Sequence, residues 1–218
     1  MGIGLALFEI SKSKPGSWVV GASFAWLSGL MPVRNVYVNR HIKAFFHPRP
    51  ISERHVLVVP KYIIRGLLAL HQRSDREAIW NQIQNGLMTV TRRTFLAGDG
   101  GGRARVFCNG GDRQDVTQLH WHVIDPAASV RSWKPAEART SMPVVMGGSP
   151  PRGQLHVVVR APNDIDASLM ALSSMAINGL GAILESAAGF TFVFGDAVDG
   201  LFPPTGQPAL HVLIETPQ

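Results

Sequence analysis

Two histidines and a glutamine recur at every second position of an otherwise apolar segment near the middle of the chain. Residues 118–124 read Gln-Leu-His-Trp-His-Val-Ile. Because successive side chains of a β-strand point to opposite faces, a strand here would place Gln118, His120 and His122 on one face. A neutral imidazole can attack phosphorus, and all three side chains can donate a hydrogen bond to a phosphate oxygen. The spacing therefore predicts a polar strand face that lines a site.

A glycine-rich polar connection lies just before this segment. It contains Asn109, Gly110, Gly111 and Gln114. Backbone N–H groups of such a loop can surround an anion, and a glutamine amide can donate to a phosphate oxygen. Another glycine-rich stretch, 98–102, is interpreted as a flexible connection because no Gly-Lys-Ser/Thr follows it. The first loop and the histidines together indicate phosphate chemistry.

The elements that must position these residues form a strand-rich pattern with one long helix. Short apolar or alternating segments predict five strands, at 35–38, 42–46, 55–59, 105–108 and 118–124. Ser74 and Glu77 have the spacing of a helix capping box. Apolar side chains then repeat at helical spacing, at Ile79, Ile83, Leu87 and Val90. The pattern predicts an α+β fold in which this helix packs on a sheet.

A similar order of elements returns after residues 131–152, which are predicted to be a linker because Pro, Ala, Gly and Ser dominate them. In residues 153–218 the pattern predicts a strand, a helix and two strands, at 156–159, 169–183, 190–194 and 210–214. We interpret this order as an internal repeat, with chance reuse of a common α+β pattern as the alternative. Leu213 stands at the place of His122, so this half is predicted to have lost any chemistry.

Composition bounds the class of protein and its partners. With 45% hydrophobic and 17% charged residues among 218, the chain is predicted to be globular rather than disordered. A net charge of +6 favours anionic partners, but the basic residues are scattered, so there is no strong nucleic-acid signal. A single cysteine, Cys108, excludes an intrachain disulfide and a Cys-x-x-Cys zinc site. These features agree with a cytoplasmic location.

The N-terminal residues 1–33 are predicted to form an apolar helical extension. Residues 17–33 are largely apolar but short for a bilayer span, which needs roughly 20 residues. The favoured interpretation is a helix packed on the domain. Trp18 and Trp26 keep a membrane-surface helix open as an alternative, so peripheral membrane contact is a second expectation.

Residues 34–124 resemble a histidine-triad (HIT) domain. The resemblance lies in five landmarks, at 44–50, 55–61, Asn109-Gly110, Gln114 and 118–124. The family hallmark is His-φ-His-φ-His-φ-φ, with φ apolar, and Gln118 stands here in place of the first histidine. The resemblance implies an antiparallel five-stranded sheet with a packed helix over 34–130. It also implies dimerisation, either of two chains or, through the degenerate second half, as a pseudo-dimer within one chain.

The resemblance implies a nucleotidyl hydrolase or transferase that forms a nucleotidyl-histidine intermediate. The substrate would be a nucleoside 5′-phosphate conjugate, either a phosphoramidate or a dinucleoside polyphosphate, cleaved at its α-phosphate. His120 would be the nucleophile, with His122 and Gln114 stabilising the phosphate and the leaving group, and with Gln118 as the altered fourth member. The residues implied in substrate binding are Phe45, His47, His55, Asn109, Gly110 and Gly111.

Two departures from the family pattern leave other functions open. Gln118 cannot carry a proton, and His47 stands where the family has a carboxylate that binds the ribose hydroxyls. A non-catalytic nucleotide sensor is therefore one alternative, and removal of adenylate from nucleic-acid ends is a second. A metal bound by His-x-His with His47 or His55 as a third ligand is also conceivable. No cofactor and no metal is predicted, because no carboxylate or cysteine cluster accompanies the histidines.

Overall fold

The computed structural model describes residues 33–95, 104–114, 116–124, 154–160, 169–194 and 209–215. The chain divides into two compact units. The first consists of Met1–Arg105 with Asp115–Lys134, and the second of Val106–Gln114 with Pro135–Gln218. The predicted N-terminal extension up to residue 32, the glycine-rich stretch 98–102 and the predicted linker 131–152 lie outside the described residues.

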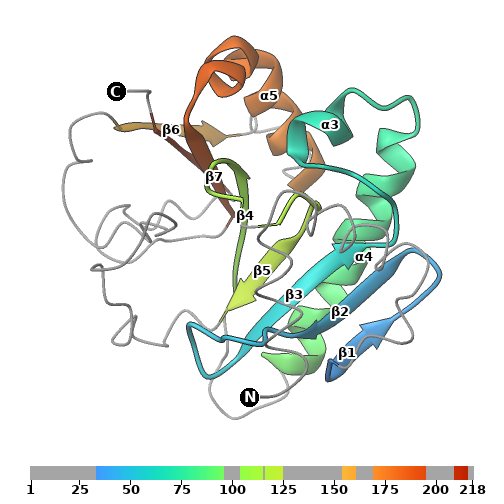
Figure 1. Ribbon diagram of the computed structural model, residues 1–218. Helices are drawn as coiled ribbons and strands as arrows, with labels where there is room; N and C mark the ends of the chain where they lie inside the picture. The colour runs from blue at the N-terminus through green and yellow to red at the C-terminus, as the bar shows by residue number, and fades with distance from the viewer. Residues whose placement is uncertain are drawn as a thin grey trace. The chain divides into compact units, whose positions relative to one another are not determined.

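The first unit contains an antiparallel sheet with strands in the order β1-β2-β3-β5. The strands are β1 (Asn35–Val38), β2 (Ile42–Phe46), β3 (His55–Pro60) and β5 (Trp121–Ile124). Two helices follow β3 in the chain, α3 (Leu67–His71) and α4 (Arg76–Thr94). Helix α4 runs across one face of this sheet (Figure 1). The predicted α+β arrangement, with a helix on an antiparallel sheet, is therefore confirmed.

Helix α4 packs through the apolar face that its spacing predicted. The buried residues of that face are Ile79, Trp80, Ile83, Gly86, Leu87 and Val90. Gly86 allows close approach to the sheet, since a Cβ atom there would lie 3.0 Å from Cγ2 of Ile42. The indole of Trp80 meets that of Trp121 edge to face, with ring centroids 5.4 Å apart. Burial of these large side chains supplies most of the attraction between helix and sheet.

The predicted capping box at the start of this helix is wrong. The helix begins at Arg76, its N-cap residue is Asp75, and no side chain caps it. Both carboxylate oxygens of Asp75 instead accept hydrogen bonds from the Arg73 guanidinium, at 2.7 and 2.8 Å. These two charge-assisted bonds occupy the carboxylate oxygens of Asp75, which would otherwise accept a hydrogen bond from a backbone N–H at the start of the helix.

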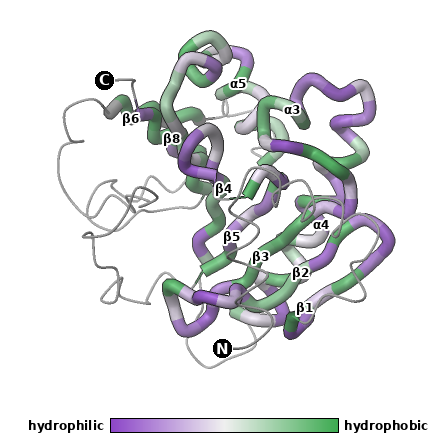
Figure 2. The backbone as a smooth tube through the Cα atoms, in the orientation of Figure 1, coloured by the Kyte–Doolittle hydropathy of each residue, from purple (hydrophilic) through white to green (hydrophobic). Residues whose placement is uncertain are grey.

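The second unit contains an antiparallel sheet with strands in the order β4-β7-β8-β6. The strands are β4 (Arg105–Gly111), β7 (Gly189–Phe194), β8 (Ala209–Glu215) and β6 (Gln154–Arg160). Helix α5 (Leu169–Ser186) packs on β6, β7 and β8. It is the one described helix that is long and apolar enough to cross a membrane by length and composition, a test that soluble core helices also pass. Figure 2 shows its mainly apolar character.

The predicted five-stranded sheet is wrong. Eight strands occur among the described residues, and β4, predicted as the fourth strand of the first half, pairs with β7 over six residues, Val106 to Gly111. Both Phe107 and Cys108 are buried. A strand that is apolar on both faces needs neighbours that cover it, and the second half of the chain supplies one of them. An internal duplication stays a prediction.

Gly110 illustrates how closely β4 and β7 approach. It pairs with Phe190, and a Cβ atom at Gly110 would lie 2.1 Å from Cζ of the Phe190 ring. The ring is itself buried, so it has no space into which to withdraw. A glycine is therefore required at this position of the sheet, independently of any role in binding an anion.

We expect the substitution Gly110→Ala to lower the free energy of unfolding by roughly 1–3 kcal/mol, the usual cost of overpacking a core. The matched control is Gly179→Ala on α5, where a Cβ atom meets nothing within 4 Å. Alanine favours a helix over glycine by about 0.5–1 kcal/mol, so the control should be neutral or stabilising. Urea denaturation of both variants measures the difference, and equal stability would show that Phe190 yields easily.

Candidate active site

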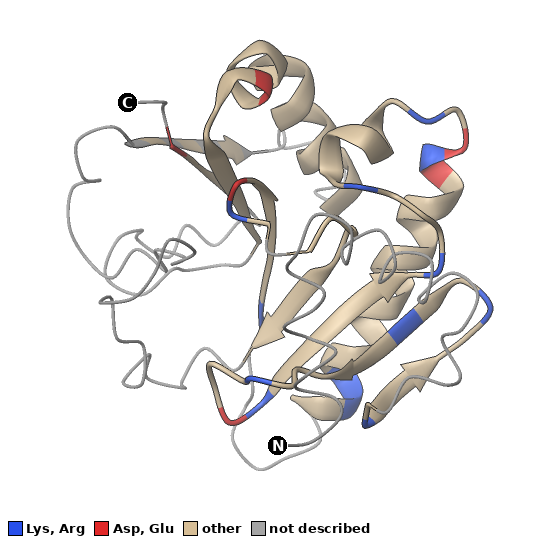
Figure 3. Cartoon of the chain, viewed as in Figure 1, with Lys and Arg blue, Asp and Glu red and all other residues tan. Residues whose placement is uncertain are grey.

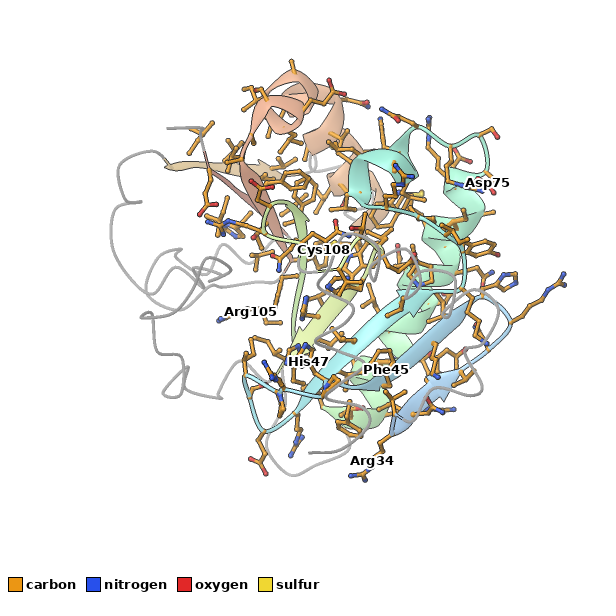
Figure 4. All side chains as sticks on the ribbon, viewed as in Figure 1. Arg34, Phe45, His47, Asp75, Arg105 and Cys108 are labelled. Carbon is orange, nitrogen blue, oxygen red and sulfur yellow. The ribbon has the colours of Figure 1, made fainter. Side chains whose placement is uncertain are left out.

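Four histidines of the first unit come together, and we call them the histidine cluster: His47, His55, His120 and His122. Ring centroids lie 4.2 Å apart for His47 and His55, 5.1 Å for His55 and His122, and 4.9 Å for His120 and His122. His47 lies just beyond the end of β2 (Figure 4). Its backbone N–H donates to the His55 carbonyl at 2.8 Å, which holds the two residues side by side.

The histidine cluster lies on the face of the sheet opposite α4. Ile42 of β2 faces the helix at Gly86, so the alternation of the strand turns Phe45 to the other face. There Phe45 packs with Leu57 and Val59. Leu57 is also the direct cross-strand partner of His122, which places the apolar group and the histidine on the same surface. The site therefore has an apolar part beside its polar part.

A directed chain of hydrogen bonds fixes the proton on two of the rings. The Ile51 N–H donates to Nδ1 of His55 at 3.3 Å, so this nitrogen is an acceptor and the proton of His55 is on Nε2. That Nε2–H lies 2.9 Å from Nδ1 of His122 and donates to it. His122 in turn carries its own proton on Nε2. Both rings are neutral in this arrangement.

The electrostatic surroundings agree with neutral rings. Burial, together with the neighbouring His47 and His120, lowers the pKa of His55 to about 2. Burial also holds the pKa of His122 well below its ordinary value, with His120, His55 and His47 adding to the effect. An imidazolium at either of these buried positions would lose most of its hydration. Few charged side chains lie along the strands of this unit, as Figure 3 shows.

His120 and His47 complete the pattern with opposite roles. Nδ1 of His120 lies 2.7 Å from the backbone carbonyl oxygen of Gln118. A carbonyl only accepts, so Nδ1 carries the proton and the lone pair of the ring is on Nε2. In His47 the Arg49 N–H donates to Nδ1 at 2.9 Å, so the proton is on Nε2. The cluster thus offers one lone pair, from His120, beside N–H groups of His47 and His122.

Gln118 lies outside the strand that was predicted to carry it. Strand β5 begins at Trp121, because the Leu119 N–H donates to the Ile64 carbonyl at 2.7 Å instead of joining the sheet. The buried Gln118 amide donates to the carbonyls of Pro60 and Tyr62, at 3.2 and 2.8 Å. These bonds fasten the segment whose carbonyl orients His120. Any catalytic role of Gln118 stays a prediction, and its observed contacts are those of a positioning residue.

The predicted phosphate loop belongs to the second unit and contacts its own neighbours there. The Thr191 hydroxyl donates to Oδ1 of Asn109 at 2.8 Å, and Arg113 donates to the same hydroxyl at 3.3 Å. Arg113, which is buried, also forms an ion pair with the partly exposed Glu215. The roles of Asn109, Gly110, Gly111 and Gln114 in binding phosphate stay predictions.

Sequence reasoning missed this network and the bond between His55 and His122. The bond joins residues 67 positions apart, and the ion pair joins residues 102 positions apart. Neither leaves a local pattern, because both depend on which strands become neighbours. The resemblance between the two halves was the one sequence signal for these contacts. It suggests which strands correspond to one another, but it does not say which side chains meet.

Comparison with known proteins gives a match over the first half of the chain. An uncharacterized HIT-like protein from Buchnera aphidicola subsp. Baizongia pistaciae is 26% identical over 98 residues, which are 45% of this chain and 85% of that protein. A HIT family hydrolase structure from Clostridium thermocellum is 21% identical, covers 49% of this chain and 88% of its own, and has a TM-score of 0.40. Yeast Ap4A phosphorylase Apa2 in complex with AMP is 13% identical over 90% of this chain and 63% of its own, with a TM-score of 0.45.

The family model that matches is that of the HIT domain. The match runs from residue 30 to residue 128. It therefore includes the whole of β1 to β5 and all the members of the histidine cluster. Residues 30–128 of this chain are a match to the HIT domain family.

Proposed function

We propose that the histidine cluster cleaves a nucleoside 5′-phosphate conjugate at its α-phosphate, with His120 as the nucleophile. The observation that carries the proposal is the 2.7 Å bond from Nδ1 of His120 to the Gln118 carbonyl. It holds the ring in the tautomer whose Nε2 lone pair can attack phosphorus, and it stabilises the positive charge that develops on the ring. The ring is only partly buried, so a substrate can reach it.

The reaction has two steps. In the first, Nε2 of His120 forms a bond to the α-phosphorus while the bond to the leaving group breaks, and the leaving group takes a proton from solvent, which the attacking water returns in the second step. In the second, water or another acceptor attacks the phosphoramidate and the P–N bond breaks, which releases the nucleoside monophosphate or its transferred form and restores His120. A histidyl intermediate of this kind replaces one difficult displacement by two easier ones.

His122 and His47 would stabilise the charge on the phosphate. Phosphate oxygens are acceptors only, and the bond directions in the cluster leave Nε2–H on both rings as donors. His55 holds His122 in this tautomer through the 2.9 Å bond between the rings. A preorganised donor needs no rotation as charge develops in the transition state.

The apolar group beside the cluster would receive the nucleoside. Phe45, Leu57 and Val59 pack together on the face that carries the histidines. In the HIT family the corresponding region binds the nucleoside, and an acidic residue there accepts hydrogen bonds from the ribose. His47 stands at that place and donates instead, so we infer that the ribose contact differs from that of the family.

The direct test is to incubate the purified full-length chain with an adenylyl amidate and, separately, with a dinucleoside polyphosphate. We expect release of nucleoside monophosphate, and an acid-labile adduct on the protein when the reaction is quenched early and analysed by mass spectrometry. Tight nucleotide binding by calorimetry without release would overturn the enzyme and favour a nucleotide sensor. Turnover of adenylylated nucleic acid alone would favour the deadenylase alternative.

We also propose that residues 153–218 are a degenerate repeat of the first half, which would make the chain a pseudo-dimer. The supporting observation is equivalent pairing: β3 pairs with β5 around α4 in chain order, as β6 pairs with β8 around α5. A pseudo-dimer predicts a monomer of 23.7 kDa in sedimentation equilibrium. A mass of twice that value would show instead that the chain pairs with a second copy.

A further inference from the structure

We propose that His47, His55 and His122 together bind a divalent transition-metal ion of the zinc type. Each of the three rings offers one ligand nitrogen, and these nitrogens all lie within 4.8 Å of one another. Three imidazoles with a fourth position left open are a known donor set for Zn²⁺. The site does not depend on the proposed activity, since it requires neither a nucleotide nor the lone pair of His120.

The three nitrogens need only small shifts to reach bonding distance: the pair from His55 and His122 must separate slightly, and His47 must approach. A Zn–N bond is about 2.0–2.1 Å long, so two ligands of a tetrahedral ion are roughly 3.4 Å apart. Nε2 of His55 and Nδ1 of His122 are already 2.9 Å apart. His47 lies beyond the last residue of β2, outside the paired strand, so its ring can move toward the others without breaking the sheet.

The positions of the ring protons show which hydrogen bonds would break when a metal binds. A coordinating nitrogen must present its lone pair, so the proton between His55 and His122 has to leave that space. A neutral His55 then carries its proton on Nδ1 and gives up the bond from the Ile51 N–H. His47 gives up the bond from the Arg49 N–H whichever nitrogen it uses, because Nδ1 would either bind the metal or become protonated. Two backbone amides thus lose their acceptors.

The surroundings suit a metal with an open position. His55 and His122 are buried and neutral, which is the form that ligates metals. Three neutral ligands leave the charge of the ion uncompensated, so the fourth position favours an anion such as hydroxide or phosphate. The sequence predicted no metal because no carboxylate or cysteine cluster accompanies the histidines, and it paired His122 with His120. The sheet register instead groups His122 with two residues more than 65 positions away.

Titration of the metal-free full-length protein with Co²⁺ and with Zn²⁺ tests the proposal. We expect one equivalent to bind, with visible Co²⁺ absorption of a tetrahedral site that Zn²⁺ removes. His47→Asn should weaken Zn²⁺ binding by at least about tenfold, the scale at which ligand-sphere changes act. His71→Asn, which alters a histidine of α3 outside the cluster, is the matched control and should bind as the wild type does.

Amide NMR of the wild-type protein gives a readout that does not require a folded variant. Zn²⁺ should shift the amide resonances of Arg49 and Ile51 and speed their exchange with solvent, because both lose their hydrogen-bond acceptors. The Leu119 amide, which donates to the Ile64 carbonyl, should not change. Unchanged Arg49 and Ile51 resonances at saturating Zn²⁺, or equal affinity of His47→Asn and the wild type, would overturn the proposal.

Discussion

Replacing His120 with alanine is expected to lower the rate of nucleotide release by a factor on the order of 10³ or more, about 4 kcal/mol of transition-state stabilisation. The reason is that the tautomer of His120 places its lone pair on Nε2, whereas His122 carries its proton on Nε2 and accepts from His55 at Nδ1. Initial rates of nucleoside monophosphate release under saturating substrate measure the effect.

The matched control for this prediction is His71→Asn, which should retain the wild-type rate because His71 lies on α3, away from the strands of the cluster. Circular dichroism of both variants should match the wild type, since His120 is only partly buried. A rate for His120→Ala equal to that of the wild type would remove His120 as the nucleophile. The fold and the metal site would be unaffected by that result.

Acid is expected to unfold the first unit well before its carboxylates titrate. The pKa of His55 is about 2 in the folded protein and near its ordinary value of 6.5 when unfolded. Between these values the unfolded chain binds one proton more than the folded chain, so the free energy of unfolding falls as the pH falls. From pH 6.5 to pH 5 His55 alone should cost about 2 kcal/mol. His122, with its lowered pKa, acts in the same direction.

Urea denaturation at several pH values between 7 and 5 measures this slope. The variant His55→Gln is the comparison for this pH dependence, because glutamine does not titrate in either the folded or the unfolded state. We expect the variant to be less stable at pH 7 but less sensitive to acid. A wild-type free energy of unfolding that stays constant from pH 6.5 to pH 5 would show that the cluster accepts a proton without cost.

The sequence predicted the helices and strands of this chain better than it predicted which strands pair with one another. The apolar spacing of α4 and the pattern of β2 and β3 are local properties, and periodicity reports them directly. The start of α4 was missed because the Arg73 side chain takes the Asp75 carboxylate. Both oxygens of that carboxylate accept from the guanidinium, so neither of them caps the helix.

The sequence drew attention to the histidines of the candidate site but did not predict their hydrogen bonds. Alternation along 118–124 indicated the importance of His120 and His122, yet Gln118 turned out to lie before the strand and to hold two backbone carbonyls. The contact of His122 with His55 depends on the register between β3 and β5. Register is set by packing over the whole sheet, so no window of sequence contains it.

The pairing of β4 with β7 bears on how the two halves of the chain can evolve. Residues 189–194 hold β4 in place over its full length, and the ring of Phe190 fills the space above Gly110. The second half can therefore lose every reactive group and still not be dispensable. We expect mutational tolerance to be low along β7. Selection on β7 would then act on how the strand packs against β4 rather than on any chemical reactivity of its side chains.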